Sequence, residues 1–147
     1  MEGNTLIKYI YSYLTFYTNI NIILVILYKY TAKYYDLHLS CLIVALVSFG
    51  ITYIYPREIV VNIDENTKHV YPTGTVSSII VDFIMHWIPL IFVFAFVPIE
   101  KNKTNTIRTF AIIVLYIIAF QAHDLYNFNH FISILFMILA LVARFSL

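Results

Sequence analysis

Asp82 and His86 are the residues of this chain whose types and spacing are best suited to chemistry. They lie one helical turn apart inside an apolar stretch of membrane-spanning length, residues 76–97, and Trp87 and Pro89 follow directly. Hydrocarbon cannot solvate a carboxylate or an imidazolium, so ionisable side chains at such depth normally face a bundle interior or a wet cavity. The pair therefore indicates either a functional site or a buried polar network, and both interpretations stay open.

A stripe of polar side chains runs along the first apolar segment. Spacings of three and four residues place on one helical face Tyr11, Ser12, Thr15, Thr18 and Asn19. With a rise of about 1.5 Å per residue, Thr15 and His86 each lie roughly 12–15 Å into the membrane, so we expect them to meet. For Thr15 alone a structural role is favoured, because hydroxyls in membrane helices often bond only the carbonyl one turn back.

The chemistry open to these residues is nucleophilic attack by a hydroxyl. A threonine hydroxyl becomes a nucleophile only when a base removes its proton, and neutral imidazole near pH 7 suits that role. We therefore expect Thr15 as nucleophile, His86 as general base and Asp82 as the group that orients the imidazole. Asn19, the Trp87 indole or a nearby tyrosine is the candidate donor to a developing oxyanion. The supporting residues are thus Asp82, Asn19, Thr18 and Trp87.

Composition indicates the element that must position these side chains, which is a membrane-spanning helix. The chain has 147 residues, of which 61% are hydrophobic and 12% charged, and its mean hydropathy is +0.83. A bilayer core of about 30 Å needs roughly 20 apolar residues, and isolated strands would leave backbone groups unpaired in lipid. We predict an all-α polytopic membrane protein, a single domain over residues 1–147. Its helices are expected at about 7–30, 39–55, 76–98, 107–123 and 127–146.

The connections predict the orientation of this bundle. One side, with the N-terminus and the polar connection 56–75, carries Lys8, Arg57 and Lys68. The other side carries Lys29, Lys33, Lys101, Lys103, Arg108 and Arg144. The excess of positive charge on the second side favours a cytoplasmic C-terminus and an N-terminus that is outside or lumenal. The first segment is long and polar on one face, so we expect it to stay as a spanning helix rather than a cleaved signal.

Other classes of site receive little support. A single cysteine, Cys41, rules out an internal disulfide, and no Cys/His spacing resembles a zinc site. A net charge of +1 without a basic run gives no footprint for nucleic acid. A metal site from His123, Asp124 and His130 is a weak alternative to a solvated loop between the last two helices. We expect no metal and no cofactor.

Two motifs resemble a known family. Residues 13–19, Tyr-Leu-Thr-Phe-Tyr-Thr-Asn, resemble the aromatic-x-Thr-x-x-Ser/Thr-Asn motif of the androgen-induced membrane proteins, and residues 83–89 resemble their histidine-containing helix. Residues 54–59 and 71–72 resemble the family's segment ahead of that histidine, so the likeness covers most of the chain. Vertebrate members are membrane hydrolases that cleave fatty acid esters of hydroxy fatty acids with a threonine and a histidine. The resemblance implies these roles for Thr15 and His86. Compared with that family, we expect the threonine helix to be the first, with no counterpart of the family's first helix.

Three functions follow as hypotheses. The leading one is an integral membrane hydrolase of long-chain acyl esters, whose substrate enters sideways from the bilayer and whose partners are the bilayer and that lipid ester. The second is a non-catalytic structural membrane protein, an organelle or virion scaffold, in which the polar stripes only join helices. The third is a proton or ion pathway through Asp82, His86 and His123, although no selectivity-filter pattern or transporter-like repeat occurs in the sequence.

Overall fold

Helices make up most of the part of the chain that the structure describes. The computed structural model describes residues 6–7, 17–50, 53, 59–64, 67–71, 75–121 and 130–147, with the backbone alone for both strands and for residues 120, 121 and 130. The separate helices are α2 (Tyr17–Ile26), α3 (Tyr28–Thr31), α4 (Leu37–Phe49), α7 (Lys103–Gln121) and α8 (His130–Ser146). A continuous helical rod is formed by α5 (Val76–Asp82), the π-helical turn η2 (Phe83–Trp87) and α6 (Ile88–Phe96).

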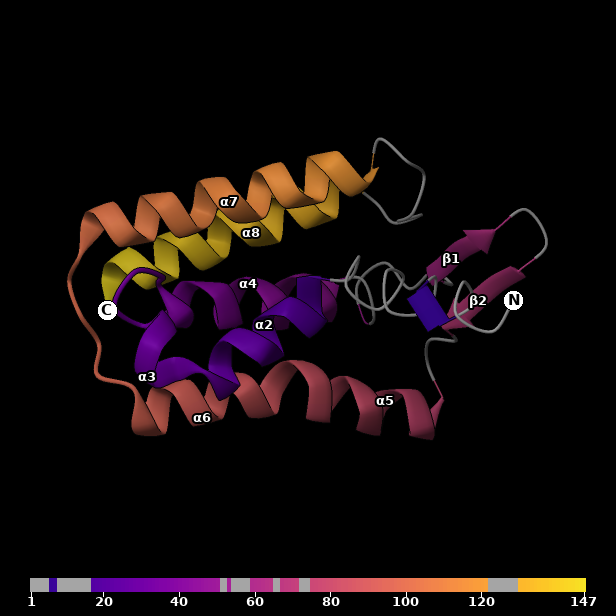
Figure 1. Ribbon diagram of the computed structural model, residues 1–147, viewed down its shortest axis with the longest axis horizontal. Helices are drawn as coiled ribbons and strands as arrows, with labels where there is room; N and C mark the ends of the chain where they lie inside the picture. The colour runs from indigo at the N-terminus through magenta and orange to yellow at the C-terminus, as the bar shows by residue number, and fades with distance from the viewer. Residues whose placement is uncertain are drawn as a thin grey trace.

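The helix α4 is the central element of the bundle. It packs against α8, α6, α2 and α7, and also against the π-helical turn η2. In Figure 1, α7 and α8 are drawn on one side of α4 and α2, and the α5–α6 rod lies on the other. Both α7 and α8 pack against α4. The approach of α8 is close at Gly50, where an added Cβ would come within 2.7 Å of the Phe136 ring. A larger residue at position 50 would therefore push these helices apart.

The rod from Val76 to Phe96 has defined local causes for its start and for its irregular middle. Thr75 caps it, because its side chain accepts from the Ser78 backbone while the Ser78 side chain accepts in return from the Thr75 backbone. Pro89 has no N–H to donate and crowds the turn before it, and the preceding turn widens so that the Ile88 N–H bonds the Phe83 carbonyl. His86 lies in this widened turn.

The predicted polar connection 56–75 contains a β-hairpin, which differs from the all-α prediction. Strand β1 (Ile59–Asp64) pairs antiparallel with β2 (Thr67–Tyr71), in a register that places Val60 opposite Val70. The β-branched run Ile59-Val60-Val61 favours an extended backbone, which explains why a strand forms inside a connection that is polar as a whole. The helical part of the prediction is confirmed for the described residues.

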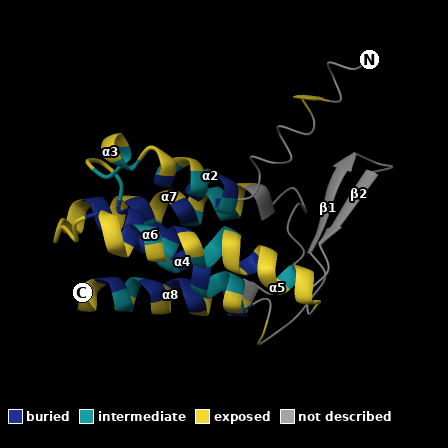
Figure 2. Cartoon of the chain, turned by 90° about the horizontal axis from the view of Figure 1, so that it is seen from below, coloured by how far each residue is buried: buried dark blue, intermediate teal, exposed yellow. Residues whose placement is uncertain are grey.

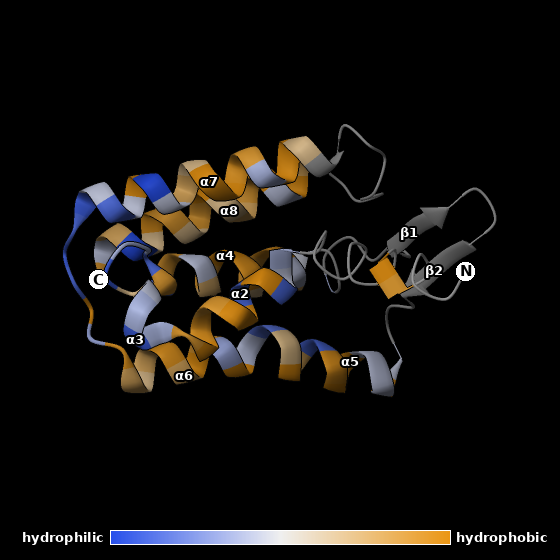
Figure 3. Ribbon diagram, in the orientation of Figure 1, coloured by the Kyte–Doolittle hydropathy of each residue, from blue (hydrophilic) through white to orange (hydrophobic). Residues whose placement is uncertain are grey.

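The outer surface of the bundle is strongly apolar. Exposed residues follow the outer face of the α5–α6 rod in Figure 2, and the same rod is largely hydrophobic in Figure 3. Large exposed side chains of this rod include Val76, Ile80, Ile84, Ile91 and Phe96. Val76–Phe96, with 21 residues, is the one helix among the described residues that is long and apolar enough to cross a membrane. Shorter apolar helices occupy Tyr17–Ile26, Leu37–Phe49 and Phe131–Ser146.

The connections between the helices gather at opposite ends of the bundle. In Figure 1 the C-terminus, α3 and the link from α6 to α7 lie at one end, and the hairpin lies beyond the other. Contacts at the first end are direct, since the Arg144 side chain donates to the Glu100 carbonyl at 2.6 Å and Asn105 donates to the Lys33 carbonyl at 3.2 Å. The helices therefore alternate in direction along the chain.

Candidate active site between α2, α4 and the α5–α6 rod

The imidazole of His86 contacts side chains from three separate stretches of the chain. Its Nε2 lies 3.2 Å from Oγ1 of Thr18 in α2. Its Nδ1 lies 2.8 Å from Oδ1 of Asp82, one turn earlier on its own rod, and 3.0 Å from Oγ of Ser48 in α4. Both ring nitrogens thus have partners, a carboxylate and a hydroxyl on one side and a second hydroxyl on the other.

Asp82 is the more deeply buried member of the pair. Its side chain is 7% exposed and the His86 side chain 20% exposed. The Ser48 hydroxyl donates to Oδ1 of Asp82, and the Trp87 side chain is within hydrogen-bonding reach of the same carboxylate. A buried carboxylate needs such donors, because each replaces a water molecule that burial has removed.

This arrangement matches the geometry of a catalytic triad. In a triad the hydroxyl lies on Nε2 of a histidine and a buried carboxylate holds Nδ1, so that the imidazole can take the hydroxyl proton. Thr18, His86 and Asp82 occupy these positions at hydrogen-bonding distances. The cluster is therefore able, by its geometry, to activate the Thr18 hydroxyl for attack.

The structure brings some of the predicted site residues together, and one of them lies outside the described residues. Asp82 and His86 form the expected pair. Thr15, the predicted nucleophile, lies outside the described residues, and the hydroxyl found on the imidazole belongs to Thr18, which the sequence analysis placed only in support. Asn19 is buried in α2, and the Trp87 side chain bonds the Asp82 carboxylate. The predicted role of either as an oxyanion donor stays a prediction.

Ser48 is a residue of the cluster that the sequence analysis missed. The spacing of Ser48, Thr52 and Tyr55 indicates only a mild polar stripe that suits helix packing, and Thr52 and Tyr55 lie outside the described part of the chain. The available signal was the isolated hydroxyl in the otherwise apolar run Leu42 to Phe49. Nothing in that spacing shows which neighbouring helix the hydroxyl faces.

A second buried polar network joins α2 to the start of α4. The Tyr17 hydroxyl lies 2.5 Å from the Tyr35 hydroxyl and 2.7 Å from Oγ of Ser40, and Ser40 donates to Oδ1 of Asn21 at 2.6 Å. Asn21 also contacts Sγ of Cys41 at 3.5 Å. Burial raises the pKa of Tyr35 to about 12. These groups are paired with one another, and they hold α2 against α4.

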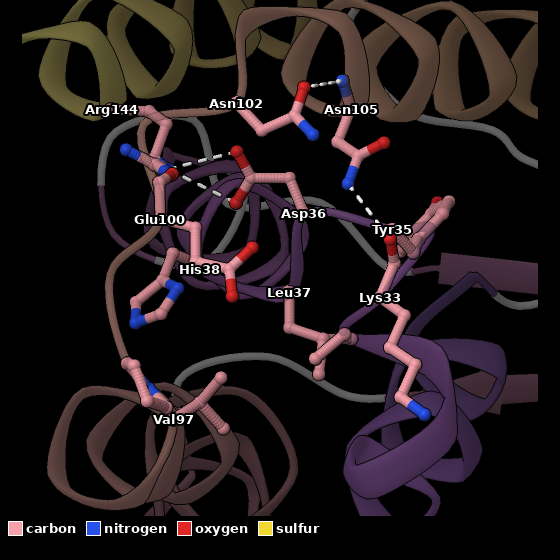
Figure 4. Close-up of a pocket in the computed structure, with 12 residues that line it drawn as sticks. Lys33, Tyr35, Asp36, Leu37, His38, Val97, Glu100, Asn102, Asn105 and Arg144 are labelled. Carbon is pink, nitrogen blue, oxygen red and sulfur yellow. Dashed lines mark hydrogen bonds and ion pairs between the residues drawn. The ribbon is translucent and has the colours of Figure 1, made fainter.

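A third cluster closes the end of the bundle where the connections meet. The Arg144 guanidinium pairs with Asp36 at 2.9 Å, Thr106 donates to Oδ2 of Asp36 at 2.5 Å, and the Thr109 hydroxyl accepts from the Asp36 N–H at 2.8 Å. Figure 4 shows Arg144 and Asp36 facing each other beside a cavity of about 90 Å³, with His38 and Glu100 nearby. Burial, followed by the Arg144 charge, lowers the pKa of His38 from its usual 6.5.

Metal-ligating side chains do not gather in the described part of the chain, where no group of three histidine, cysteine or acidic side chains is placed to hold an ion. The candidate ligands His123 and Asp124 lie outside the described residues, and the side chain of His130 is not described. The metal site at His123, Asp124 and His130 therefore stays a prediction.

No family model matches the chain, and no curated protein and no solved structure is significantly similar to it. The resemblance to the androgen-induced membrane proteins therefore rests on the short motifs at residues 13–19 and 83–89. The fold and the site together define a helical protein with an apolar surface and a histidine–carboxylate–hydroxyl cluster among its helices.

Proposed function

We propose that this chain is a multi-pass membrane protein that hydrolyses long-chain acyl esters with a threonine nucleophile and His86 as general base. The observation that carries the proposal is the contact of His86 Nε2 with a hydroxyl of the first helix, at 3.2 Å from Thr18 Oγ1, while Asp82 holds Nδ1. An ion pair within an apolar rod is costly, and a role in proton transfer accounts for its presence.

The membrane setting is supported by the surface and by the order of the connections. The exposed faces of the rod and of α8 carry large apolar residues, such as Val76 and Phe131, at 76% and 73% exposure. Alternating helices would span the bilayer with the end that carries Arg144 in the cytoplasm and the N-terminus outside or in a lumen. An acyl ester dissolved in the bilayer would reach the site laterally, between helices.

The reaction proceeds in two balanced steps. The threonine oxygen bonds to the ester carbonyl carbon while its proton moves to Nε2 of His86, and that proton then leaves with the departing alkoxide as an alcohol. A water molecule next attacks the acyl-threonine carbonyl and gives a proton to His86. His86 then returns that proton to the threonine oxygen as its bond to the acyl carbon breaks, which releases the fatty acid and restores the threonine hydroxyl. Asp82 stabilises the imidazolium at each stage.

Two hydroxyls compete for the role of nucleophile. The resemblance points to Thr15, and the contact with His86 points to Thr18, one helical turn away on the same predicted stripe. Thr18 lies on α2, and Thr15 is predicted to lie one turn before it on the same face, so the class of reaction is the same for either. Variants of each separate the two.

The experiment uses the full chain in lipid nanodiscs, a fluorophosphonate probe and a fluorogenic long-chain acyl ester. We expect His86→Gln to abolish labelling and turnover, and one of Thr15→Ala and Thr18→Ala to do the same. Thr104→Ala is the matched control, since Thr104 is an exposed hydroxyl at the start of α7. Unchanged labelling and turnover in folded Thr15→Ala, Thr18→Ala and His86→Gln proteins would contradict the proposal.

A structural membrane protein is the second candidate function. The network of Tyr17, Ser40 and Asn21 favours it, because these buried side chains are paired among themselves and only join α2 to α4. Under this alternative the His86 cluster is another such join, no ester is turned over by the wild type, and Thr18→Ala changes only the stability of the bundle. The same assay therefore decides between the two.

A further inference from the structure

Ser48 contacts both members of the buried pair, Asp82 and His86. Its hydroxyl donates to Oδ1 of Asp82, and its Oγ lies 3.0 Å from Nδ1 of His86. Asp82 Oδ1 is itself 2.8 Å from the same Nδ1. Three polar atoms from two elements, α4 and the α5–α6 rod, thus form a closed triangle.

The protons within this triangle can be assigned by counting donors. A serine hydroxyl has one proton, and that of Ser48 is used on Asp82. An ionised carboxylate only accepts, and the Ser48 oxygen, whose one proton is engaged in the hydrogen bond to Asp82, can only accept from Nδ1. Nδ1 of His86 must therefore carry the proton that both of them face.

This assignment determines what the other ring nitrogen can do. A neutral imidazole has one N–H, so with the proton on Nδ1 the lone pair is on Nε2, which lies 3.2 Å from the Thr18 hydroxyl. The opposite tautomer would place an N–H against the hydroxyl and remove the base. Selection of the tautomer is therefore equivalent to selection of the active form of His86.

We propose that Ser48 is a positioning residue, which together with Asp82 holds the Nδ1 proton of His86 so that the Nε2 lone pair faces the nucleophile. The inference rests on the proposed function for its catalytic meaning, but the tautomer itself is a property of the resting protein. A serine in a membrane helix ordinarily bonds a carbonyl of its own helix, and Ser48 instead reaches Asp82 on a neighbouring element.

The test is nitrogen-15 NMR of histidine-labelled protein in nanodiscs, with the His86 signal assigned through His86→Gln. In the wild type we expect the Nδ1–H form to predominate. Loss of one hydrogen bond corresponds to about a threefold to tenfold change in an equilibrium, so Ser48→Ala should shift the tautomer ratio by that factor and lower kcat comparably with KM unchanged. Ser48→Thr, which keeps a hydroxyl, should restore both.

The controls separate this inference from packing and from the proposed function. Ser146→Ala removes an exposed hydroxyl that bonds only the Val142 carbonyl, and should alter neither quantity. If Ser48→Ala does not fold, Ser48→Cys keeps the volume and replaces the hydroxyl by a weak donor. An unchanged His86 tautomer in the folded Ser48 variant overturns the inference. A shifted tautomer in a protein that never turns over ester supports the Ser48 role and refutes the hydrolase.

Discussion

Asp36 and Asp82 are both buried, each with 6% of the whole residue exposed, but they differ in the side chain that pairs with them. Asp36 pairs with Arg144, whose guanidinium stays charged at any physiological pH. Asp82 pairs with His86, whose other ring nitrogen, Nε2, faces the Thr18 hydroxyl. The first pair joins elements at one end of the bundle, and the second is the pair through which we propose proton transfer.

The two pairs also differ in the groups that surround them. The Asp36 carboxylate accepts hydrogen bonds from the Leu39 N–H, the Thr106 hydroxyl and the Arg144 guanidinium. Around His86, Nε2 faces the Thr18 hydroxyl, and the imidazole side chain is 20% exposed. Burial of a charge alone therefore does not mark a candidate active site; an imidazole beside a hydroxyl gives a specific reason to propose one.

The largest difference between the pairs is expected from removing the base. His86→Gln should lower turnover by about 10²–10⁴-fold, because Nε2 of His86 is the proposed acceptor of the hydroxyl proton and an amide cannot replace it. Its effect on the free energy of unfolding should be smaller than that of losing Arg144. The measurement is single-turnover hydrolysis of the acyl ester in nanodiscs, and activity within about twofold of the wild type would place His86 in the structural class of Asp36.

Removal of Arg144 should give the opposite result. Arg144→Met leaves the Asp36 carboxylate buried without its cation and should reduce the free energy of unfolding by about 3–5 kcal/mol. Turnover per folded molecule should stay near that of the wild type. Unfolding by sodium dodecyl sulfate in mixed micelles measures the loss, and adding Asp36→Asn should recover part of it. A loss no larger in Arg144→Met than in the double variant would argue against the pair.

A milder test removes one hydrogen bond to Asp36. Thr106→Val keeps the shape of the side chain and deletes the donor 2.5 Å from Oδ2. Hydrogen bonds to charged groups contribute about 1.5–3 kcal/mol, so the unfolding free energy should fall by that amount. Thr104→Val on the exposed side of the same turn is the control, and equal losses in the two variants would show that the contact with Asp36 has no particular weight.

The smallest effect concerns the pH dependence of the Asp36 cluster. The pKa of His38 is lowered in the folded protein by burial and then by Arg144, so the unfolded chain binds the proton first as the pH falls. Stability should therefore decrease below about pH 6.5, by at most about 1.4 kcal/mol per pH unit. Melting curves of the wild type and His38→Phe between pH 5 and 7.5 test this, and parallel curves would contradict it.

Much of the helical organisation was predictable from local pattern. The rod was expected at 76–98 and is found at Val76–Phe96, and the helix expected at 107–123 begins earlier, at Lys103. The earlier start has a physical reason, since Asn102 Oδ1 accepts from the Asn105 N–H and caps the helix. Only one helix of the described residues reaches spanning length and hydropathy, so the predicted number of membrane crossings stays a prediction.

One contact of the candidate site, that between Asp82 and His86, was predictable from the sequence. Asp82 and His86 are one turn apart on one helix, so their contact follows from the spacing alone. The choice of Thr18 depends on how α2 is rotated against the rod, because residues one turn apart on a helix share a face and only packing decides which one reaches the partner.

The sequence by itself determined that the chain forms apolar helices and that a carboxylate and an imidazole lie side by side within one of them, because both properties depend on residues a few positions apart. The tertiary structure decided which side chains complete each pair. Thr18 lies 68 residues from His86, Ser48 lies 38 residues from it, and Arg144 lies 108 residues from Asp36. Contacts over such separations depend on the packing and rotation of whole helices, which no local spacing specifies.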